Sequence, residues 1–185
     1  MADNYLEKKM EEHRRGVVIK RNMHRMTPGG DRPGTVSFSI DMLRVLVTDG
    51  SGKCGVAIIN RLREAGCKVA FSMADEKAGR TLAQKSGARF YPASFTGSIS
   101  EDLEKAWGGL DAVVVTDGCM PALEIIRTLR RLITVGVDPE LPSACGQAGL
   151  TINAIDVSGR EPADVANICL ILCLNASECI DGRVL

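Results

Sequence analysis

The stretch RVLVTDGSGKCG, from Arg44 to Gly55, decides how the rest of the sequence is interpreted. It joins a short apolar run to a helix-like segment, and its last six residues spell G-x-G-x-x-G. Glycines at this spacing allow a tight turn, close approach of a phosphate to the backbone, and close packing of the next helix on the strand. The N-terminus of that helix offers N–H groups to an anion. Alone the motif is weak evidence, so the surrounding pattern must support it.

Apolar runs rich in β-branched residues alternate with helix-like segments from residue 43 onward. This alternation predicts an α/β protein with a Rossmann-like three-layer fold, in which a mainly parallel sheet carries helices on both faces. Asp75 is placed to cap one helix, and Ser98 to Glu101 form a capping box that opens another. The predicted strands are 43–48, 68–72, 89–91, 112–116, 133–137, 150–155 and 183–185, and the predicted helices are 54–65, 75–86, 98–107 and 162–174.

The first forty residues differ in composition from the rest of the chain. Residues 1–15 are charged and predict a polar helix, and the stretch TPGGDRPG, Thr27 to Gly34, holds too much glycine and proline to continue a regular element. We therefore predict an N-terminal helical arm and linker over residues 1–40 and a Rossmann-like NAD(P)-binding-type domain over residues 41–185.

Charge and apolar content argue against several partners. The 23 basic residues balance the 23 acidic ones, so no net field attracts nucleic acid or an anionic membrane. No apolar run reaches the roughly 20 residues of a membrane helix, and the N-terminus lacks the apolar centre of a signal peptide. The seven cysteines include no C-x-x-C pair and are expected to remain free thiols. We expect a cytoplasmic protein that binds neither nucleic acid nor membrane.

Residues Arg44–Asp117 resemble the first half of a short-chain dehydrogenase/reductase, in the segments RVLVTDGSGKCGVAIINRLREAGCKVAF and GARFYPASFTGSISEDLEKAWGGLDAVVVTDG. The likeness resumes in GLTINAIDVSGREPADVANICLILC near the end, and together these segments cover about three quarters of the chain. The resemblance implies a Rossmann fold, NAD or NADP as cofactor, hydride transfer to or from a carbonyl or alcohol, and a homo-oligomer, either a dimer or a tetramer.

The phosphate loop departs from the family pattern T-G-x-x-x-G-x-G. Thr48 matches, but Asp49 and Lys53 stand at the first two glycine positions, and of the three glycines only Gly55 remains in place. Asp and Lys do not fit a backbone that requires positive φ, and their side chains occupy space near the phosphates. Two interpretations stay open: the shifted glycines form a working phosphate loop, or the loop is a structural remnant.

Other cofactor contacts that the resemblance implies are also altered. Met73 and Ala74 stand where the family has an acid for the ribose or a base for the 2′-phosphate, and helix capping explains Asp75 better than a ribose contact does. Ser94 replaces the acid that contacts adenine, and Val115 begins a degraded form of the motif N-N-A-G. We predict weak or absent NAD(P) binding. The candidate cofactor-binding residues are Thr48, Gly50, Ser51, Gly52, Lys53, Gly55 and Gly118.

A phosphate-loop NTPase is the competing interpretation of Gly52-Lys53. It fails because Val47 stands where the first glycine of G-x-x-x-x-G-K-[ST] belongs. Cys54 also replaces the hydroxyl residue that ligates magnesium.

The family's catalytic Tyr-x-x-x-Lys has no counterpart after the fourth predicted strand. The sequence has two tyrosines, Tyr5 and Tyr91, and only about thirty residues separate Gly118 from Gly149, where the family has several times as many. Tyr5 and Lys9 do spell Y-x-x-x-K, but in the charged N-terminal segment, where a solvated helix is the simpler interpretation. We assign no catalytic residue and no metal ligand.

The leading hypothesis is a degenerate short-chain dehydrogenase/reductase-like protein, a pseudoenzyme that binds a nucleotide or anion with little or no catalysis. The first alternative is an NAD(P)-dependent oxidoreductase with a non-standard site. The second is a structural oligomerisation module that binds no nucleotide.

Cysteines at 169 and 173, one turn apart on an apolar helix, are expected to be buried core residues and not metal ligands.

Overall fold

The structure is a computed structural model, and it describes residues 43–92, 94–116, 129–136, 150–174 and 180–185. The predicted arm over residues 1–40 and the candidate residue Gly118 lie outside the described residues. The division between arm and domain therefore stays a prediction.

The described residues alternate between strands and helices as the sequence predicts, and element bounds differ by one or two residues. Helix α2, for example, begins at Lys53, one residue before the predicted start. The strands are β1 (Arg44–Val47), β2 (Lys68–Met73), β3 (Arg89–Pro92), β4 (Ala112–Val115), β5 (Arg131–Gly136), β6 (Thr151–Asp156) and β7 (Arg183–Val184). The helices are α2 (Lys53–Glu64), α3 (Glu76–Ser86), α4 (Ile99–Trp107) and α5 (Pro162–Cys173).

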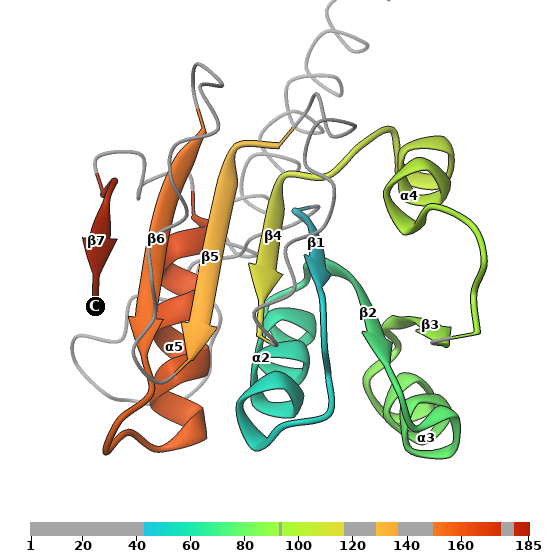
Figure 1. The fold of residues 1–185 in the computed structure, drawn as a ribbon, viewed down its shortest axis with the longest axis horizontal. Helices are drawn as coiled ribbons and strands as arrows, with labels where there is room; N and C mark the ends of the chain where they lie inside the picture. The colour runs from blue at the N-terminus through green and yellow to red at the C-terminus, as the bar shows by residue number, and fades with distance from the viewer. Residues whose placement is uncertain (1–42, 93, 117–128, 137–149, 175–179) are drawn as a thin grey trace, which may run out of the picture. The chain divides into compact units, whose positions relative to one another are not determined.

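The seven strands form one sheet in the order β3-β2-β1-β4-β5-β6-β7, and every neighbouring pair is parallel (Figure 1). All carboxyl ends therefore lie at one edge. The chain order reverses between β1 and β4, and at such a switch point an open α/β sheet leaves a crevice outside its strand ends. The segment that follows β1 therefore lies where folds of this kind bind ligands.

Helices cover both faces of the sheet, which confirms the predicted three-layer α/β fold. On one face α2 and α5 pack side by side, and Ile58, Leu62 and Cys169 join a core with the buried strand residues (Figure 1). Leu82 of α3 belongs to the same core. On the other face Leu103 of α4 packs with a second set of strand residues.

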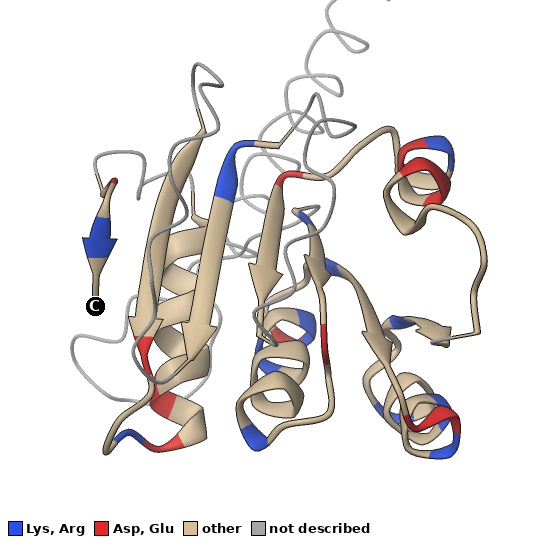
Figure 2. Ribbon diagram, viewed as in Figure 1, with Lys and Arg blue, Asp and Glu red and all other residues tan. Residues whose placement is uncertain are grey.

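Charged residues lie mainly in the helices and connections, and the strands between them are apolar (Figure 2). This distribution fits strands that are buried on both sides. Local signals fix the helix ends: the hydroxyl of Ser98 accepts a hydrogen bond from the Glu101 N–H at 3.3 Å. At the C-termini of α3 and α4, Gly87 and Gly108 adopt left-handed conformations, with φ of 72° and 77°.

Polar contacts tie β1 to β4 at both ends of the pair. At the amino ends Arg44 donates from Nε and Nη2 to the Asp111 carboxylate, at 2.9 and 2.7 Å. Burial acts to raise the pKa of Asp111, but hydrogen bonds from Arg44 and its charge outweigh burial, so the pKa is lowered. The ion pair holds in register the two strands between which the chain order reverses. In the described part of the chain, no helix has the length and apolar content needed to cross a membrane.

Candidate functional site

The segment between β1 and α2 is fixed to two neighbouring strands. Thr116, directly after β4, donates its hydroxyl to the carbonyl of Asp49 at 2.6 Å and accepts from the Asp49 N–H at 3.1 Å. The Gly50 N–H donates to the carbonyl of Ser72 in β2 at 2.9 Å. The hydroxyl of Thr48 accepts from the Thr116 N–H at 3.2 Å. The loop therefore leaves the sheet in a defined conformation, supported from β2 and from the end of β4.

The three loop glycines have different surroundings. A Cβ at Gly50 lies 2.9 Å from both Ile59 and Phe71 side-chain atoms, and a Cβ at Gly55 lies 2.6 Å from the carbonyl oxygen of Asp49. A Cβ at Gly52 has no heavy atom within 4 Å. Gly50 and Gly55 thus permit close packing of helix on strand, and Gly52 leaves open space at the helix start. Close packing of helix on strand at the third glycine, and open space at the second, match the roles of those positions in G-x-G-x-x-G.

None of these glycines needs a positive φ. Among the described glycines a positive φ occurs elsewhere, for example at Gly66 and Gly159, and Gly52 has a φ of −76°. The shifted glycines are therefore not needed for a left-handed conformation, and Lys53, as the first residue of α2, has a right-handed helical backbone that any residue adopts. Close approach, not backbone handedness, explains why glycine is needed in this loop.

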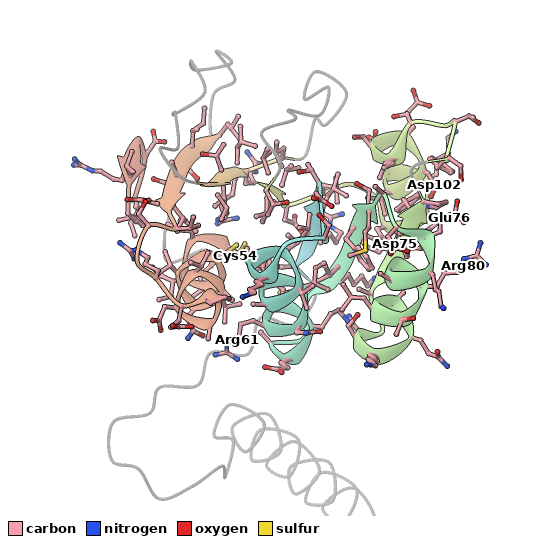
Figure 3. The ribbon with its side chains drawn as sticks, turned by 60° about the horizontal axis from the view of Figure 1, so that its bottom comes forward. Cys54, Arg61, Asp75, Glu76, Arg80 and Asp102 are labelled. Atoms are coloured by element: carbon pink, nitrogen blue, oxygen red, sulfur yellow. The ribbon has the colours of Figure 1, made fainter. Side chains whose placement is uncertain are left out.

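The N-terminus of α2 has no side-chain cap and no acidic residue in its first turn. The first N–H groups of a helix have no partner within the helix, and here they belong to Lys53, Cys54 and Gly55. Lys53 is exposed, and Cys54 lies at the start of α2 (Figure 3). Backbone N–H groups, the positive end of the helix dipole and an adjacent ammonium together favour an anion here.

A carboxylate from the same loop already occupies part of this region. Asp49 accepts a hydrogen bond from the Ser51 N–H at 3.0 Å, and its second oxygen accepts from the Ser51 hydroxyl. In the family pattern the position of Asp49 is a glycine, which has no carboxylate to offer. Two donors beside the start of α2 are therefore satisfied within the chain.

The side chains at the end of β2 are engaged within the protein, and the Ser72 hydroxyl donates to the carbonyl of Thr48. Met73 is buried, with 5 % of its surface exposed, and packs toward Gly50. Asp75 caps α3 by accepting from the Ala78 N–H at 3.0 Å, as the sequence predicts, and it lies at the start of that helix (Figure 3). Ser94 donates its hydroxyl to the Glu76 carboxylate at 2.8 Å. The side chains near β2 and β3 are thus engaged with each other.

We expect Asp75→Ala to lower the free energy of unfolding by about 1 kcal/mol, because it removes a helix N-cap. Any affinity for an added dinucleotide should change less than twofold, since capping accounts for the carboxylate. Ser98→Ala, which removes the cap of α4, is the matched control. Urea unfolding and calorimetric titration measure the two quantities. A tenfold loss of affinity without loss of stability would instead assign Asp75 to a ligand.

Tyr91 is a packing residue of β3, as the sequence predicts. Its hydroxyl donates to Asp102, and Arg89 lies over its ring at 5.1 Å. Burial, followed by the hydrogen bond to Asp102, raises the pKa of Tyr91 above its usual range. A phenol with a raised pKa is a poor proton carrier at neutral pH.

The described cysteines near α5 are buried thiols. Cys67, Cys169 and Cys173 belong to the core. Burial raises the pKa of Cys67 to about 12, and a hydrogen bond with Cys173 together with burial raises that of Cys169. Thiols of this kind are unreactive. Within the described ranges, no group of three or more His, Cys, Asp or Glu residues is arranged to hold a metal ion.

The arrangement has clear counterparts among solved structures. It superposes on BdcA from E. coli with a TM-score of 0.57 at 21 % identity, covering 80 % of this chain and 97 % of that one. The TM-score with a Serratia marcescens short-chain dehydrogenase/reductase is 0.61 at 15 % identity, and the match covers 80 % of this chain and 97 % of that one. The TM-score with a Pseudomonas aeruginosa RhlG/NADP active-site complex is 0.60 at 17 % identity, and the match covers 80 % of this chain and 96 % of that one. BdcA has also been solved in complex with NADPH.

Sequence comparison adds a partial match. L-fucose dehydrogenase of Mus musculus is 36 % identical over 88 residues, which span 44 % of this chain and 32 % of the relative. The match thus covers about a third of that relative's length, and no family model matches the chain. The predicted resemblance is confirmed: this chain has the fold of the short-chain dehydrogenase/reductases.

The structure brings six of the seven candidate cofactor residues together at the carboxyl edge of β1, and the seventh, Gly118, lies outside the described residues. Sequence reasoning missed Thr116 and Ser72 as supports of the loop, and it missed the contact between Asp49 and Ser51. Hydroxyl residues at the ends of adjacent parallel strands were the available signal, since the Ser72 hydroxyl donates to the Thr48 carbonyl and the Thr116 hydroxyl donates to the Asp49 carbonyl. The six described candidates are Thr48, Gly50, Ser51, Gly52, Lys53 and Gly55.

Proposed function

We propose that this chain is a short-chain dehydrogenase/reductase-like module that binds NAD(P), or a related anion, weakly at the N-terminus of α2 and has little or no dehydrogenase activity. The observation that carries the proposal is the loop between β1 and α2. Its Gly50 and Gly55 allow close packing, its Gly52 is open, and the helix start has no side-chain cap. Such a helix start is suited to a phosphate.

The relatives support a dinucleotide as the ligand class. BdcA and RhlG, which share this fold, have been solved with NADPH and NADP. In open α/β sheets a dinucleotide lies across the switch point, which here falls between β1 and β4. The proposed ligand would place its pyrophosphate near Gly52 and Lys53.

Affinity should be low because the adenosine side lacks partners. Met73 takes the place of a carboxylate, and losing one hydrogen bond to a charged group costs roughly 1.5–3 kcal/mol, or about ten- to 150-fold in affinity. Ser94 is hydrogen-bonded to Glu76, and Val115 is buried in β4. Starting from an affinity of order 1 μM, we expect dissociation constants of roughly 100 μM or weaker.

Catalysis should be feeble because the tyrosine that the family uses for proton transfer has no counterpart that suits this role. Tyr91 of β3 is hydrogen-bonded to Asp102 of α4, and the sequence has no Tyr-x-x-x-Lys after β4. General acid–base catalysis needs a group whose pKa lies near the working pH. The raised pKa of Tyr91 moves it away from that range.

Titration calorimetry with NAD and NADP, together with cofactor turnover over a panel of carbonyls and alcohols, tests the proposal. We expect weak binding of both cofactors, NADP at most slightly favoured through Lys53, and turnover at the detection limit. Tyr91→Phe should leave any turnover unchanged. Dissociation constants near 1 μM, robust turnover, or loss of turnover in Tyr91→Phe would contradict it.

A working oxidoreductase with a non-standard site is the second candidate. The partial match to L-fucose dehydrogenase favours it, because that relative's name carries the activity. Robust turnover in the same panel would select this candidate.

We further propose a cytoplasmic homo-oligomer, a dimer or tetramer, with residues 1–40 as a separate arm. Light scattering at micromolar concentration tests the oligomer, and a monodisperse monomer would contradict it.

A further inference from the structure

The loop after β1 carries an internal anion that the proposed function does not explain. Asp49 lies four residues before Lys53, the first residue of α2, and its two carboxylate oxygens accept from the N–H and the hydroxyl of Ser51. Ser51 is exposed and precedes Gly52, the N-cap of α2. Both donors therefore border the place where an external anion would approach the helix.

We propose that Asp49 weakens anion binding at this site by holding the two Ser51 donors and by adding a negative charge beside the helix start. The proposal rests on the proposed function, because it concerns the same site. A phosphate that approaches Lys53 and Gly52 must either displace the carboxylate from Ser51 or bind without those donors. Like charges in proximity also repel each other.

The surrounding contacts allow this carboxylate to be removed without disturbing the loop. Asp49 is held through its backbone by Thr116, and the next residue, Gly50, is held by the carbonyl of Ser72. These bonds do not involve the Asp49 side chain. Asp49→Ala therefore removes the internal anion alone, and Asp49→Asn keeps the size and one acceptor while removing the charge.

A matched control exists at the end of β6. Asp156 accepts from the Ser158 N–H at 2.8 Å, the same contact between residues i and i+2. β6 stands three strands from β1 in the sheet, a separation of about 14 Å at the usual strand spacing. Asp156→Ala thus makes the same change in net charge and local hydrogen bonding away from the start of α2.

The experiment is calorimetric titration of the full chain and the three variants with NADP and, separately, with inorganic pyrophosphate. We expect Asp49→Ala to bind both probes about tenfold more tightly than the unsubstituted chain, because two donors to a charged group are released. The affinity of Asp49→Asn should lie between those of Asp49→Ala and the unsubstituted chain. The affinity of Asp156→Ala should equal that of the unsubstituted chain. Thermal unfolding checks that each variant is folded. If Asp49→Ala does not fold, the comparison of Asp49→Asn with the unsubstituted chain still tests the proposal.

The outcomes separate the two proposals. Measurable binding by the unsubstituted chain with no gain in Asp49→Ala and Asp49→Asn overturns the role of Asp49 and leaves the proposed function intact. A similar gain in affinity in Asp156→Ala also overturns the role of Asp49, because the change in net charge alone would then explain the tighter binding. Absence of binding in all variants at millimolar probe overturns both proposals.

Discussion

Gly55→Val should destabilise the domain by about 3 kcal/mol, the upper part of the usual range for overpacking a core. A Cβ at this position lies 2.6 Å from the carbonyl oxygen of Asp49 and 3.1 Å from the Cα of Gly50. Both neighbours are backbone atoms that Thr116 and Ser72 hold in place, so no flexible side chain can move aside. Helix α2 must shift away from the sheet, and anion binding should be lost with it.

Urea unfolding measures the effect, and Gly52→Ala provides the control in the same loop. Gly52 has a φ of −76° and no heavy atom within 4 Å of an added Cβ. Its substitution should cost less than about 1 kcal/mol, the loss expected when alanine replaces glycine at an N-cap. A Gly55→Val variant as stable as the unsubstituted chain would show that the loop and α2 can separate without penalty.

Phe71→Ala should have the largest effect of any single substitution considered for this chain, a loss of about 3–5 kcal/mol. Phe71 is fully buried in β2, its ring centroid lies 5.3 Å from that of Phe90, and its ring borders Gly50. Truncation leaves a cavity between the sheet and the helices and removes a support of the loop. Such a loss is a large share of the 5–15 kcal/mol that stabilises a typical domain.

Phe95→Ala is the matched control, since Phe95 is 39 % exposed and makes an edge contact with Tyr91 at 5.1 Å. The same change of side chain there should cost less than about 1 kcal/mol. Denaturant unfolding of both variants gives the comparison. Equal losses at the two positions would contradict the assignment of Phe71 to the core that supports the loop.

Local patterns in the sequence were sufficient to predict most of the fold. Alternating apolar runs and helix-like segments predicted the strands and helices to within one or two residues, and Asp75 and Ser98 marked helix starts correctly. These signals depend on neighbours within a few residues, so they can be read without the tertiary structure. The order of the strands in the sheet came only from the structure, because periodicity does not tell which strands pair.

The candidate loop was predicted in position but not in mechanism. The sequence located the glycines and the changed positions Asp49 and Lys53, yet it left open whether the backbone there needs positive φ. The structure shows that none of the three loop glycines has a positive φ, and that a Cβ added at Gly50 or Gly55 lies too close to the atoms around it. Those atoms include side chains of β2 and α2, and only folding brings them near.

The sequence by itself determined the α/β class, the position of the loop after β1 and the absence of a Tyr-x-x-x-Lys sequence after β4, because each follows from residue types and short spacings. Only the tertiary structure decided that Thr116 and Ser72 support the loop, and that the Asp49 side chain turns to Ser51. Thr116 lies 67 residues from Asp49 in the chain. Contacts at such separations depend on how parallel strands are paired, and side-chain direction depends on which donors the folded backbone presents.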